Sequence, residues 1–416
     1  MTDAMRTATA PPTLDVRADF PILQREINGH RLVYLDSAST SQKPEAVIAA
    51  LDDYYRHHNA NIHRGVYPLA QEADALFEGA RRRIAEFMGA PVRSTIFTRN
   101  VTEAINLVAY SWGRTTLAPG DTVLITEMEH HSNIVPWQLA TQATGAELRY
   151  LEIDDAGTLS LDQLDRELER GDVRLVALTH VSNVLGTINP VAEVVARAHA
   201  AGALVLIDGA QAVPQMPVDF AAIGADFYAW TGHKALGPTG VGVLHADAAL
   251  LDAMPPFLAG GDMIASVEAQ HSTWNELPWK FEAGTSMIAE VVGLGAAIDY
   301  LDALDMDRVR AHEHQLVAYT LEQLAATDGV TVYGPASADD RGGVVSFSVA
   351  GIHPHDVAEL LGRENVCVRA SHHCAQPLMA RLGVPATARA SFAPYSVPAD
   401  VDALVDAVRG AQRVFA

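Results

Sequence analysis

The chain has 416 residues, 49% of them hydrophobic, which is enough to bury a large core and predicts one large domain with a smaller one. Its formal net charge of −22 argues against nucleic acid or an anionic membrane as a partner, because both attract basic surfaces. Its two cysteines, Cys367 and Cys374, are too few for a disulfide framework and fit a reducing compartment, so we expect a cytoplasmic protein.

We expect the N-terminal stretch to carry no targeting signal. Residues 4–13 are rich in Ala, Thr and Pro, and we expect residues 1–15 to form a flexible tail. The first 20 residues lack the apolar centre of a signal peptide, and no later run reaches the length of a membrane span. We therefore expect no membrane attachment.

Short apolar segments then alternate with helical ones. The expected strands are 122–125, 174–179, 203–208, 226–230 and 241–245. Residues 161–168 and 191–201 have helical spacing. Such alternation predicts an α/β fold, with a mostly parallel sheet covered by helices on both faces.

The pattern changes after a helical stretch at 290–304. Residues 330–333 and 343–349 look like strands, and residues 400–415 form an amphipathic helix. We expect a large domain at 16–300, whose first part packs with a smaller α+β domain at 301–416.

Two segments in the first half could bind ligands. Thr102 lies near the start of a helix that follows a short strand, where free N–H groups favour a phosphate. Asn100 and Glu103 also have the spacing of an ordinary capping pair, so both interpretations stay open. Further on, His130 and His131 lie beside carboxylates and could suggest zinc. Neighbouring positions seldom reach one metal, so we expect none here.

A lysine and an aspartate follow two of the expected strands. Asp208 ends a buried strand, where ligands of an α/β sheet bind, although it could also cap the next helix. Gln211 follows three residues on. Lys234 lies in the turn TGHKALGPTG, where an amine could form a Schiff base with an aldehyde cofactor, or could simply be a solvated loop lysine.

Together these two motifs resemble the class V aminotransferase family of fold-type I pyridoxal-phosphate enzymes. The resemblance implies that Lys234 forms the Schiff base with pyridoxal 5'-phosphate, that Asp208 pairs with the pyridine nitrogen and that Gln211 contacts the ring hydroxyl. It implies a mostly parallel sheet of the seven-stranded type in the large domain. Its implied phosphate ligands are Thr102, Thr231 and His233.

The same resemblance assigns three further positions. His130 would stack on the cofactor ring, and a histidine that titrates near neutrality could also move protons to and from a substrate thiol. Asn183 would touch the cofactor hydroxyl or the substrate carboxylate, although a turn role is an alternative. Residues 283–285, Ala-Gly-Thr, match a loop whose threonine, here Thr285, usually reaches the phosphate of the other subunit, which implies a homodimer.

Cys374 follows His372 and His373, and such neighbours could lower the pKa of its thiol and make it a nucleophile. A buried structural thiol, a zinc ligand beside the two histidines and a disulfide with Cys367 are the alternatives. Cys367 lies in an apolar run and is expected to be a small core residue.

The stretch from Arg369 to Ala375 resembles the Suf-type (type II, SufS-like) cysteine desulfurases, which usually have glycine where Ser371 stands. The resemblance implies an enzyme that converts L-cysteine to L-alanine and leaves a persulfide on Cys374. Arg389 would clamp the substrate carboxylate, and Arg369 would line the site. The sulfur would pass to a SufE-like or SufU-like acceptor and the Suf scaffold, for iron–sulfur cluster assembly.

Three other functions remain as alternatives. A selenocysteine lyase or related lyase would share the fold and the cofactor. An aminotransferase would not require Cys374. A silent scaffold subunit would be expected to have lost Lys234 or Cys374, and both are present.

Overall fold

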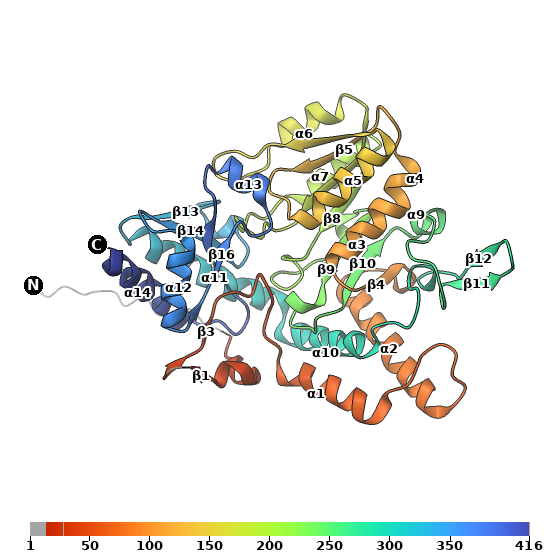
Figure 1. Ribbon diagram of the computed structural model, residues 1–416, viewed down its shortest axis with the longest axis horizontal. Helices are drawn as coiled ribbons and strands as arrows, with labels where there is room; N and C mark the ends of the chain where they lie inside the picture. The colour runs from red at the N-terminus through yellow and green to blue at the C-terminus, as the bar shows by residue number, and fades with distance from the viewer. Residues whose placement is uncertain (1–13, 28, 416) are drawn as a thin grey trace, which may run out of the picture.

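The computed structural model describes residues 14–27 and 29–415 (Figure 1). Most of the expected tail, residues 1–13, lies outside the described residues. Leu14 is already buried, and its backbone N–H donates to Nδ1 of His312 at 3.1 Å. The described part of the chain therefore begins at the core.

A seven-stranded sheet forms the centre of the larger part, in the order β4-β10-β9-β8-β7-β5-β6. β10 runs antiparallel to both of its neighbours, and the remaining pairs are parallel. The mostly parallel sheet predicted from the sequence is thereby confirmed. The strands are β4 (Thr95–Thr98), β5 (Thr122–Thr126), β6 (Glu147–Leu151), β7 (Val173–Thr179), β8 (Leu204–Asp208), β9 (Phe227–Thr231) and β10 (Gly242–Ala246).

Helices cover both faces of this sheet, which explains why its inner strands are apolar throughout. Successive side chains of a strand point to opposite faces. In β8, Val205 and Ile207 join one core while Leu206 joins the other. A strand buried on both faces reads as a continuous apolar run rather than an alternating one.

The first core also contains side chains of α2, α7 and α10, and the second contains those of α3 and α5. The predicted helices at 161–168, 191–201 and 290–304 are confirmed to within two residues. The helices of this part are α1 (Glu45–Asp53), α2 (Pro68–Phe87), α3 (Val101–Val108), α4 (Arg114–Thr116), α5 (Val135–Thr144), α6 (Leu161–Leu168), α7 (Val191–Ala200), α8 (Phe220–Ile223), α9 (Ala248–Ala253) and α10 (Ile288–Leu304).

The C-terminal part has its own antiparallel sheet, in the order β13-β14-β17-β16, and its own apolar core. The expected strands at 330–333 and 343–349 and the closing helix are present. The elements are β13 (Val330–Tyr333), β14 (Val344–Val349), β15 (Val366–Cys367), β16 (Arg369–Ser371), β17 (Thr387–Ser391), α11 (Met306–Ala325), α12 (Pro354–Arg363), α13 (Gln376–Arg381) and α14 (Pro398–Phe415).

The N-terminal segment packs with this C-terminal part. After the short hairpin β1 (Glu26–Ile27) and β2 (His30–Arg31), strand β3 (Val33–Tyr34) pairs in parallel with β15. The next residues cross toward the large sheet, so one stretch of chain touches both parts. That crossing brings the candidate site together.

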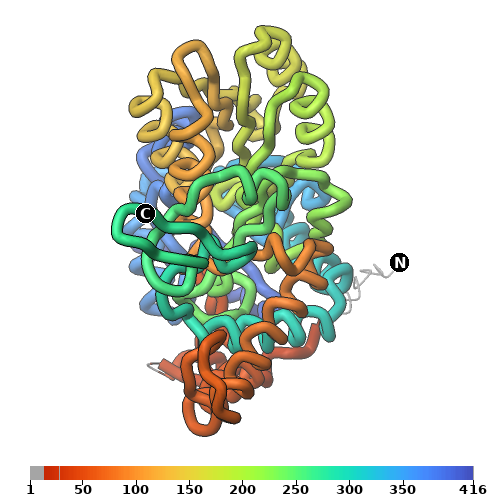
Figure 2. The backbone as a smooth tube through the Cα atoms, turned by 90° about the vertical axis from the view of Figure 1, so that its right-hand side faces the viewer, coloured from red at the N-terminus to blue at the C-terminus, as the bar shows by residue number. Residues whose placement is uncertain are grey.

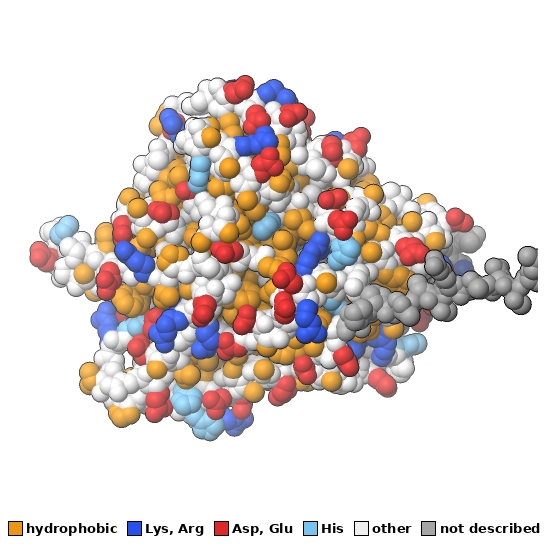
Figure 3. Space-filling view, turned by 180° about the vertical axis from the view of Figure 1, so that it is seen from behind, with side chains coloured by type: hydrophobic (Ala, Val, Ile, Leu, Met, Phe, Trp, Pro, Cys, Tyr) orange, Lys and Arg blue, Asp and Glu red, His pale blue; other side chains and the backbone are white. Residues whose placement is uncertain are grey.

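A second hairpin, β11 (Ile264–Val267) with β12 (Ser272–Trp274), projects from the larger part, and Figure 2 shows its segment on the side turned to the viewer. The face in Figure 3 has acidic groups spread among arginines, so the negative charge there is dispersed. Within the described ranges, no helix combines the length and apolar character of a membrane span.

Candidate active site

Asp208 lies at the carboxyl end of β8 and is 3% exposed. Its Oδ1 accepts the N–H of Ala210 at 3.0 Å, so it makes a tight turn rather than a helix cap. Burial raises the pKa of Asp208, while the Ala210 N–H and the charge of Lys234 oppose that shift. The turn is crowded, because a Cβ on Gly209 would lie 2.1 Å from a ring carbon of Tyr228.

Lys234 ends the short helix η7 (Gly232–Lys234), directly after β9. Burial lowers the pKa of Lys234 from 10.5 to about 8, against the opposing carboxylate of Asp208. Arg389 and Arg369 lower that pKa further, so both arginines act on the amine. A freely solvated loop lysine would not show this shift, and an amine that is partly neutral near pH 8 can attack an aldehyde.

Gln211 is held in place from two sides. Its Nε2 donates to the carbonyl oxygen of Ala38 at 2.9 Å, and its Oε1 accepts from Nε2 of Gln215 at 3.3 Å. The amide of Gln215 is fixed in turn, because its Oε1 accepts the N–H of Gly343 at 2.9 Å. The glutamine expected to contact a ring hydroxyl therefore has a set orientation.

A polar hollow fits the phosphate end of the expected cofactor. The hydroxyl of Thr231 is buried and has no hydrogen-bond partner within the described residues, so it can donate to a ligand oxygen. His233 and Thr285 line one hollow, and Thr102 lines a second that shares Arg99 with it. His233 and Thr102 therefore line two hollows that share Arg99, and Thr231 adds a buried hydroxyl without a partner, so these residues fit pyridoxal phosphate.

The cap at the start of α3 leaves room for the expected phosphate contact. Oδ1 of Asn100 accepts the N–H of Glu103 at 3.0 Å, so the capping interpretation is correct. Thr102 is exposed at the same helix end. A cap uses only one of the first N–H groups of a helix, and the others remain available for an anion.

His130 lies on a rigid loop beside Lys234. Its Nδ1 accepts the N–H of Ser132 at 3.1 Å, which leaves Nε2 to carry the proton. Burial, together with the charge of Lys234, lowers the pKa of His130 to about 3. The expectation that it titrates near neutrality is therefore wrong, since a neutral imidazole persists at pH 7. Such a ring suits stacking rather than proton release.

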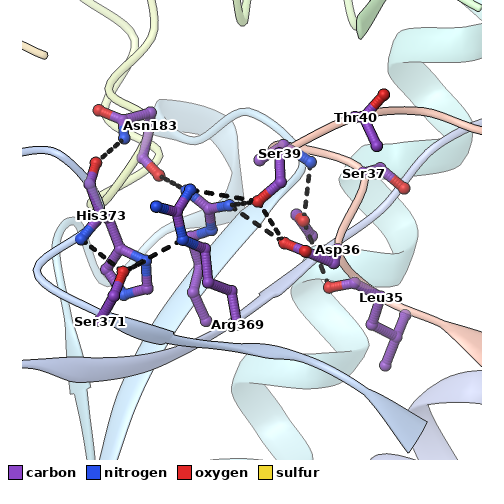
Figure 4. Close-up of polar contacts among 12 residues, drawn as sticks. Leu35, Asp36, Ser37, Ser39, Thr40, Asn183, Arg369, Ser371 and His373 are labelled. Carbon is purple, nitrogen blue, oxygen red and sulfur yellow. Dashed lines mark hydrogen bonds and ion pairs between the residues drawn. The ribbon is translucent and has the colours of Figure 1, made fainter.

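Asn183 connects the large sheet with the cysteine turn. Its Nδ2 donates to the carbonyl oxygen of His373 at 2.8 Å (Figure 4), and its own carbonyl oxygen accepts from Nη1 of Arg389, also at 2.8 Å. The side chain thus holds the protein itself. The expected contact with cofactor or substrate stays a proposal, and Oδ1 of Asn183 is the amide atom that could make it.

The two expected substrate arginines meet the N-terminal segment. Nη2 of Arg389 donates to Asp36 at 3.3 Å and to Oγ of Ser39 at 2.9 Å, and Nη1 of Arg369 reaches the same hydroxyl at 3.3 Å (Figure 4). Nε of Arg389 is buried without a partner among the described residues. A carboxylate oxygen of a small substrate would satisfy it.

Cys374 lies in a strained turn beside Arg369. Both His373 and Cys374 have positive φ, at 51° and 57°, a conformation that side chains rarely adopt. The N–H of His131 donates to the carbonyl oxygen of Cys374 at 2.7 Å, and Nη2 of Arg369 lies 3.6 Å from its sulfur. The turn therefore presents the thiol in one fixed direction.

His373 does not supply the expected positive charge. Nε2 of His373 points away to Thr387, and burial lowers the pKa of His373 to about 2. Nδ1 of His372 accepts the N–H of Cys374 at 3.1 Å. The cation that contacts the sulfur is Arg369, whose Nε donates to Oγ of Ser371 at 3.1 Å.

Two of the three competing interpretations of Cys374, the disulfide and the zinc ligand, find no support. Cys367 and Cys374 are both free thiols, so the disulfide alternative is wrong. Over residues 14–27 and 29–415, no group of three or more His, Cys, Asp or Glu side chains is arranged to hold a metal. That search gives no support to a zinc site beside His372 or His130.

The segment 36–43 also belongs to the site, although no motif in it predicted this. Its residues contact the substrate arginines, Gln211 and the turn of Lys234. The only local signal was a run of small polar residues, Ser37 to Ser41, after a short strand. Such a run is ordinary loop composition, and its partners lie more than 170 positions away along the chain.

Comparison with known proteins places the chain in a class. Residues 33–404 match the family described as Aminotransferase class-V, and the chain belongs to that family. Its fold is the fold-type I arrangement, as the sequence predicted. Within this family, the relatives of the chain have a more specific description, that of cysteine desulfurases.

A probable cysteine desulfurase of Halalkalibacterium halodurans is 51% identical over 402 residues, covering 96% of this chain and 98% of the relative. A cysteine desulfurase of Haloferax volcanii is 48% identical, covering 96% and 97%. The crystal structure of the cysteine desulfurase CsdA from Escherichia coli, in S-sulfonic acid form, superposes with a TM-score of 0.88 at 40% identity, covering 96% and 98%.

Proposed function

We propose that this protein is a pyridoxal-phosphate-dependent cysteine desulfurase of the Suf type, which moves the sulfur of L-cysteine onto Cys374. One observation carries the proposal: the thiol of Cys374, the amine of Lys234 and the open donor of Arg389 belong to one electrostatic cluster. Arg389 and Cys374 both influence the pKa of Lys234. Amine, nucleophile and carboxylate anchor therefore lie at one site.

Six residues would hold the cofactor, three of them at its phosphate. Thr231, with its unpartnered buried hydroxyl, would take a phosphate oxygen together with His233 and Thr102. Asp208 would face the ring nitrogen, and Gln211 the ring hydroxyl, while neutral His130 covers the ring. When bound, pyridoxal phosphate supplies an electron-accepting ring that delocalises negative charge from the substrate Cα.

Lys234 would serve first as the attachment point and then as the base. Its lowered pKa, about 8, leaves a useful fraction of neutral amine near neutral pH. The freed amine takes the proton from the substrate Cα and later returns a proton to carbon. Arg389 meanwhile holds the substrate carboxylate through its buried Nε.

The sulfur step uses the thiolate of Cys374. Its sulfur attacks the sulfur of the substrate, so an S–S bond forms while the substrate C–S bond breaks. The electron pair of the C–S bond stays with carbon, which is protonated to give L-alanine. Arg369, 3.6 Å from the sulfur of Cys374, stabilises the attacking thiolate. The product is a persulfide on Cys374, and no outside oxidant is needed.

The persulfide would leave through a partner protein. The Cys374 turn is pinned by its bond to the N–H of His131, so the sulfur cannot travel far. A SufE-like or SufU-like acceptor would have to reach it, and iron–sulfur cluster assembly on a Suf scaffold is the pathway proposed. We also propose a cytoplasmic homodimer in which Thr285 reaches the phosphate of the other subunit.

The decisive experiment measures sulfide and alanine released from L-cysteine by the purified protein with a thiol reductant. Equal amounts of both products, stimulated by one acceptor protein, are expected. A yellow protein that released neither would refute the desulfurase assignment and direct attention to selenocysteine or keto-acid substrates.

A further inference from the structure

Lysine is scarce in this chain. The sequence contains 29 basic residues of the Lys and Arg types, and only three of them are lysines: Lys43, Lys234 and Lys280. Arginine supplies almost every cation of the protein. Two of the three lysines nevertheless meet at one place, because Lys43 binds the turn that carries Lys234. A lysine at position 43, in a chain that otherwise uses arginine, indicates that a compact ammonium is needed there rather than a planar guanidinium.

The carbonyl oxygen of His233 has an unusual number of donors around it. Nζ of Lys43 lies 2.9 Å away, and the N–H and Oγ of Ser41 both lie 3.0 Å away. Oγ1 of Thr40 adds a fourth donor at 3.2 Å. A carbonyl oxygen has only two lone pairs, and one charged donor strengthens the interaction further. This peptide group is therefore held more firmly than an ordinary turn requires.

That carbonyl belongs to the peptide bond from which Lys234 extends. On the other side of the lysine, the N–H of Leu236 donates to Oγ of Ser41 at 3.0 Å. Leu236 has a φ of 60°, which costs a non-glycine residue energy and needs outside support. Both flanks of Lys234 are thus tied to the same short segment.

The acceptors around Lys43 are neutral. Besides His233, its Nζ reaches the carbonyl oxygen of Ser41 at 2.6 Å and the Ser41 hydroxyl at 3.3 Å. The side chain is mostly buried, and burial lowers the pKa of Lys43 to about 8. Burying an amine without a carboxylate partner is costly. The presence of this buried amine therefore indicates that Lys43 has a role other than adding charge to the surface.

We propose that Lys43 is a positioning residue for Lys234, and that its ammonium, with Ser41, sets the direction in which the Lys234 side chain leaves the backbone. The role rests on the proposed function in one respect, namely that Lys234 is the amine that takes the cofactor. Because Asp36 and Ser39 on the same segment hold Arg389, one stretch of chain orients both the amine and the carboxylate anchor.

The test uses the cofactor-free protein and three variants. Lys43→Met removes the ammonium, and Lys43→Arg keeps a cation of different shape. Lys280→Met is the matched control, because Nζ of Lys280 also holds two backbone carbonyls, those of Leu251 and Asp252, both at 2.9 Å. Pyridoxal phosphate is added, its covalent attachment is followed by absorbance, and the modified lysine is identified by borohydride reduction and peptide mass.

Attachment to Lys234 is expected to be ~10-fold slower in Lys43→Met, with kcat lowered more than KM, because misplacement of a reacting group slows the reaction itself. Lys43→Arg should recover part of the rate, and Lys280→Met should match the original protein. If Lys43→Met and Lys280→Met react at the same rate, the positioning role is refuted. If Lys43→Met does not fold, Ser41→Ala takes its place, and an unchanged attachment rate in that variant refutes the role equally.

The two proposals can fail separately. Attachment to Lys234 with no effect of Lys43→Met would overturn only the positioning role. A peptide map that places the cofactor on Lys43 or Lys280 would overturn the proposed function of Lys234, and the positioning role with it.

Discussion

The side-chain amide of Asn183 donates to the carbonyl oxygen of His373 at 2.8 Å, and so joins the loop after β7 to the turn that carries Cys374. The two residues are 190 positions apart. His373 needs such support because its φ is positive, and Cys374 follows with a positive φ of its own. The direction of the nucleophile is thus set by a residue from a loop of the larger part.

Asn183→Asp should disturb this aim. The carboxylate would face the carbonyl of His373 without a proton to donate, and the turn would shift. A misplacement on the order of 1 Å can cost ~100-fold in rate. We expect persulfide formation on Cys374 to slow by ~10- to 100-fold, measured by mass spectrometry after mixing with L-cysteine. Asn275→Asp is the control. It removes a similar hydrogen bond, from the side-chain amide of Asn275 to the carbonyl oxygen of Asp262, and should have no effect.

Cys374→Ala should separate cofactor binding from sulfur transfer. The variant keeps Lys234 and the phosphate hollow, so its cofactor absorbance should match that of the original protein. Alanine formation from L-cysteine should fall by ~1,000-fold or more, because the nucleophile is lost. Cys367→Ala, which removes the other thiol, should stay within about twofold. Undiminished turnover in Cys374→Ala would contradict the assignment of the nucleophile.

The pH dependence of cofactor uptake follows from Lys234. Its pKa is lowered to about 8, so the neutral amine is the minor form below that pH and the major form above it. The rate at which the cofactor-free protein binds pyridoxal phosphate should therefore rise with pH and level off above about 8. Asp208 opposes the lowering. Asp208→Asn should accordingly move the midpoint to lower pH, and a shift to higher pH would contradict this electrostatic account.

Glu129→Gln should destabilise the loop that carries His130. Burial raises the pKa of the Glu129 carboxyl to about 8, and its oxygens accept from Nδ2 of Asn133 at 2.7 Å and from the N–H of Thr179 at 3.0 Å. Asn133 cannot turn its amide over, because its Oδ1 accepts from Trp137 at 2.9 Å. Whichever way the new amide turns, its NH2 group therefore faces a donor, either Nδ2 of Asn133 or the N–H of Thr179.

We expect a loss of ~1–3 kcal/mol in the free energy of unfolding for this variant, measured by urea denaturation. Glu359→Gln, on the exposed surface, serves as the control and should change stability by less than ~0.5 kcal/mol. Equal stability of the two variants would show that the buried hydrogen bonds of Glu129 contribute nothing.

Much of the fold was predictable because buried strands are recognisable as short runs of apolar residues. β5, β7, β8, β9 and β10 are short apolar runs, and a strand buried on both faces can hardly be anything else. β6 was missed, since this edge strand carries Glu147 and Arg149 and leaves most of its side chains partly exposed. Its strand character comes from pairing with β5 rather than from its own composition.

The site residues divide in the same way. Lys234, Asp208 and Cys374 stand in motifs whose spacing is local, so the sequence alone could predict them as site residues together with the family. The charge near the thiol was misassigned. Adjacency suggested the histidines, but His373 turns its ring toward Thr387, and Arg369 contacts the sulfur instead.

The sequence by itself determined the alternation of buried strands with helices and the family, and it predicted Lys234 as the reactive amine, because these depend on residue type and short spacing. Only the tertiary structure decided which groups meet. Lys43 reaches His233 across 190 positions, and Asp36 reaches Arg389 across 353. Such contacts depend on how β3 pairs with β15 and where the next residues cross to the large sheet. No local sequence pattern predicts the course of the chain after β3, because a loop of small polar residues is compatible with many conformations.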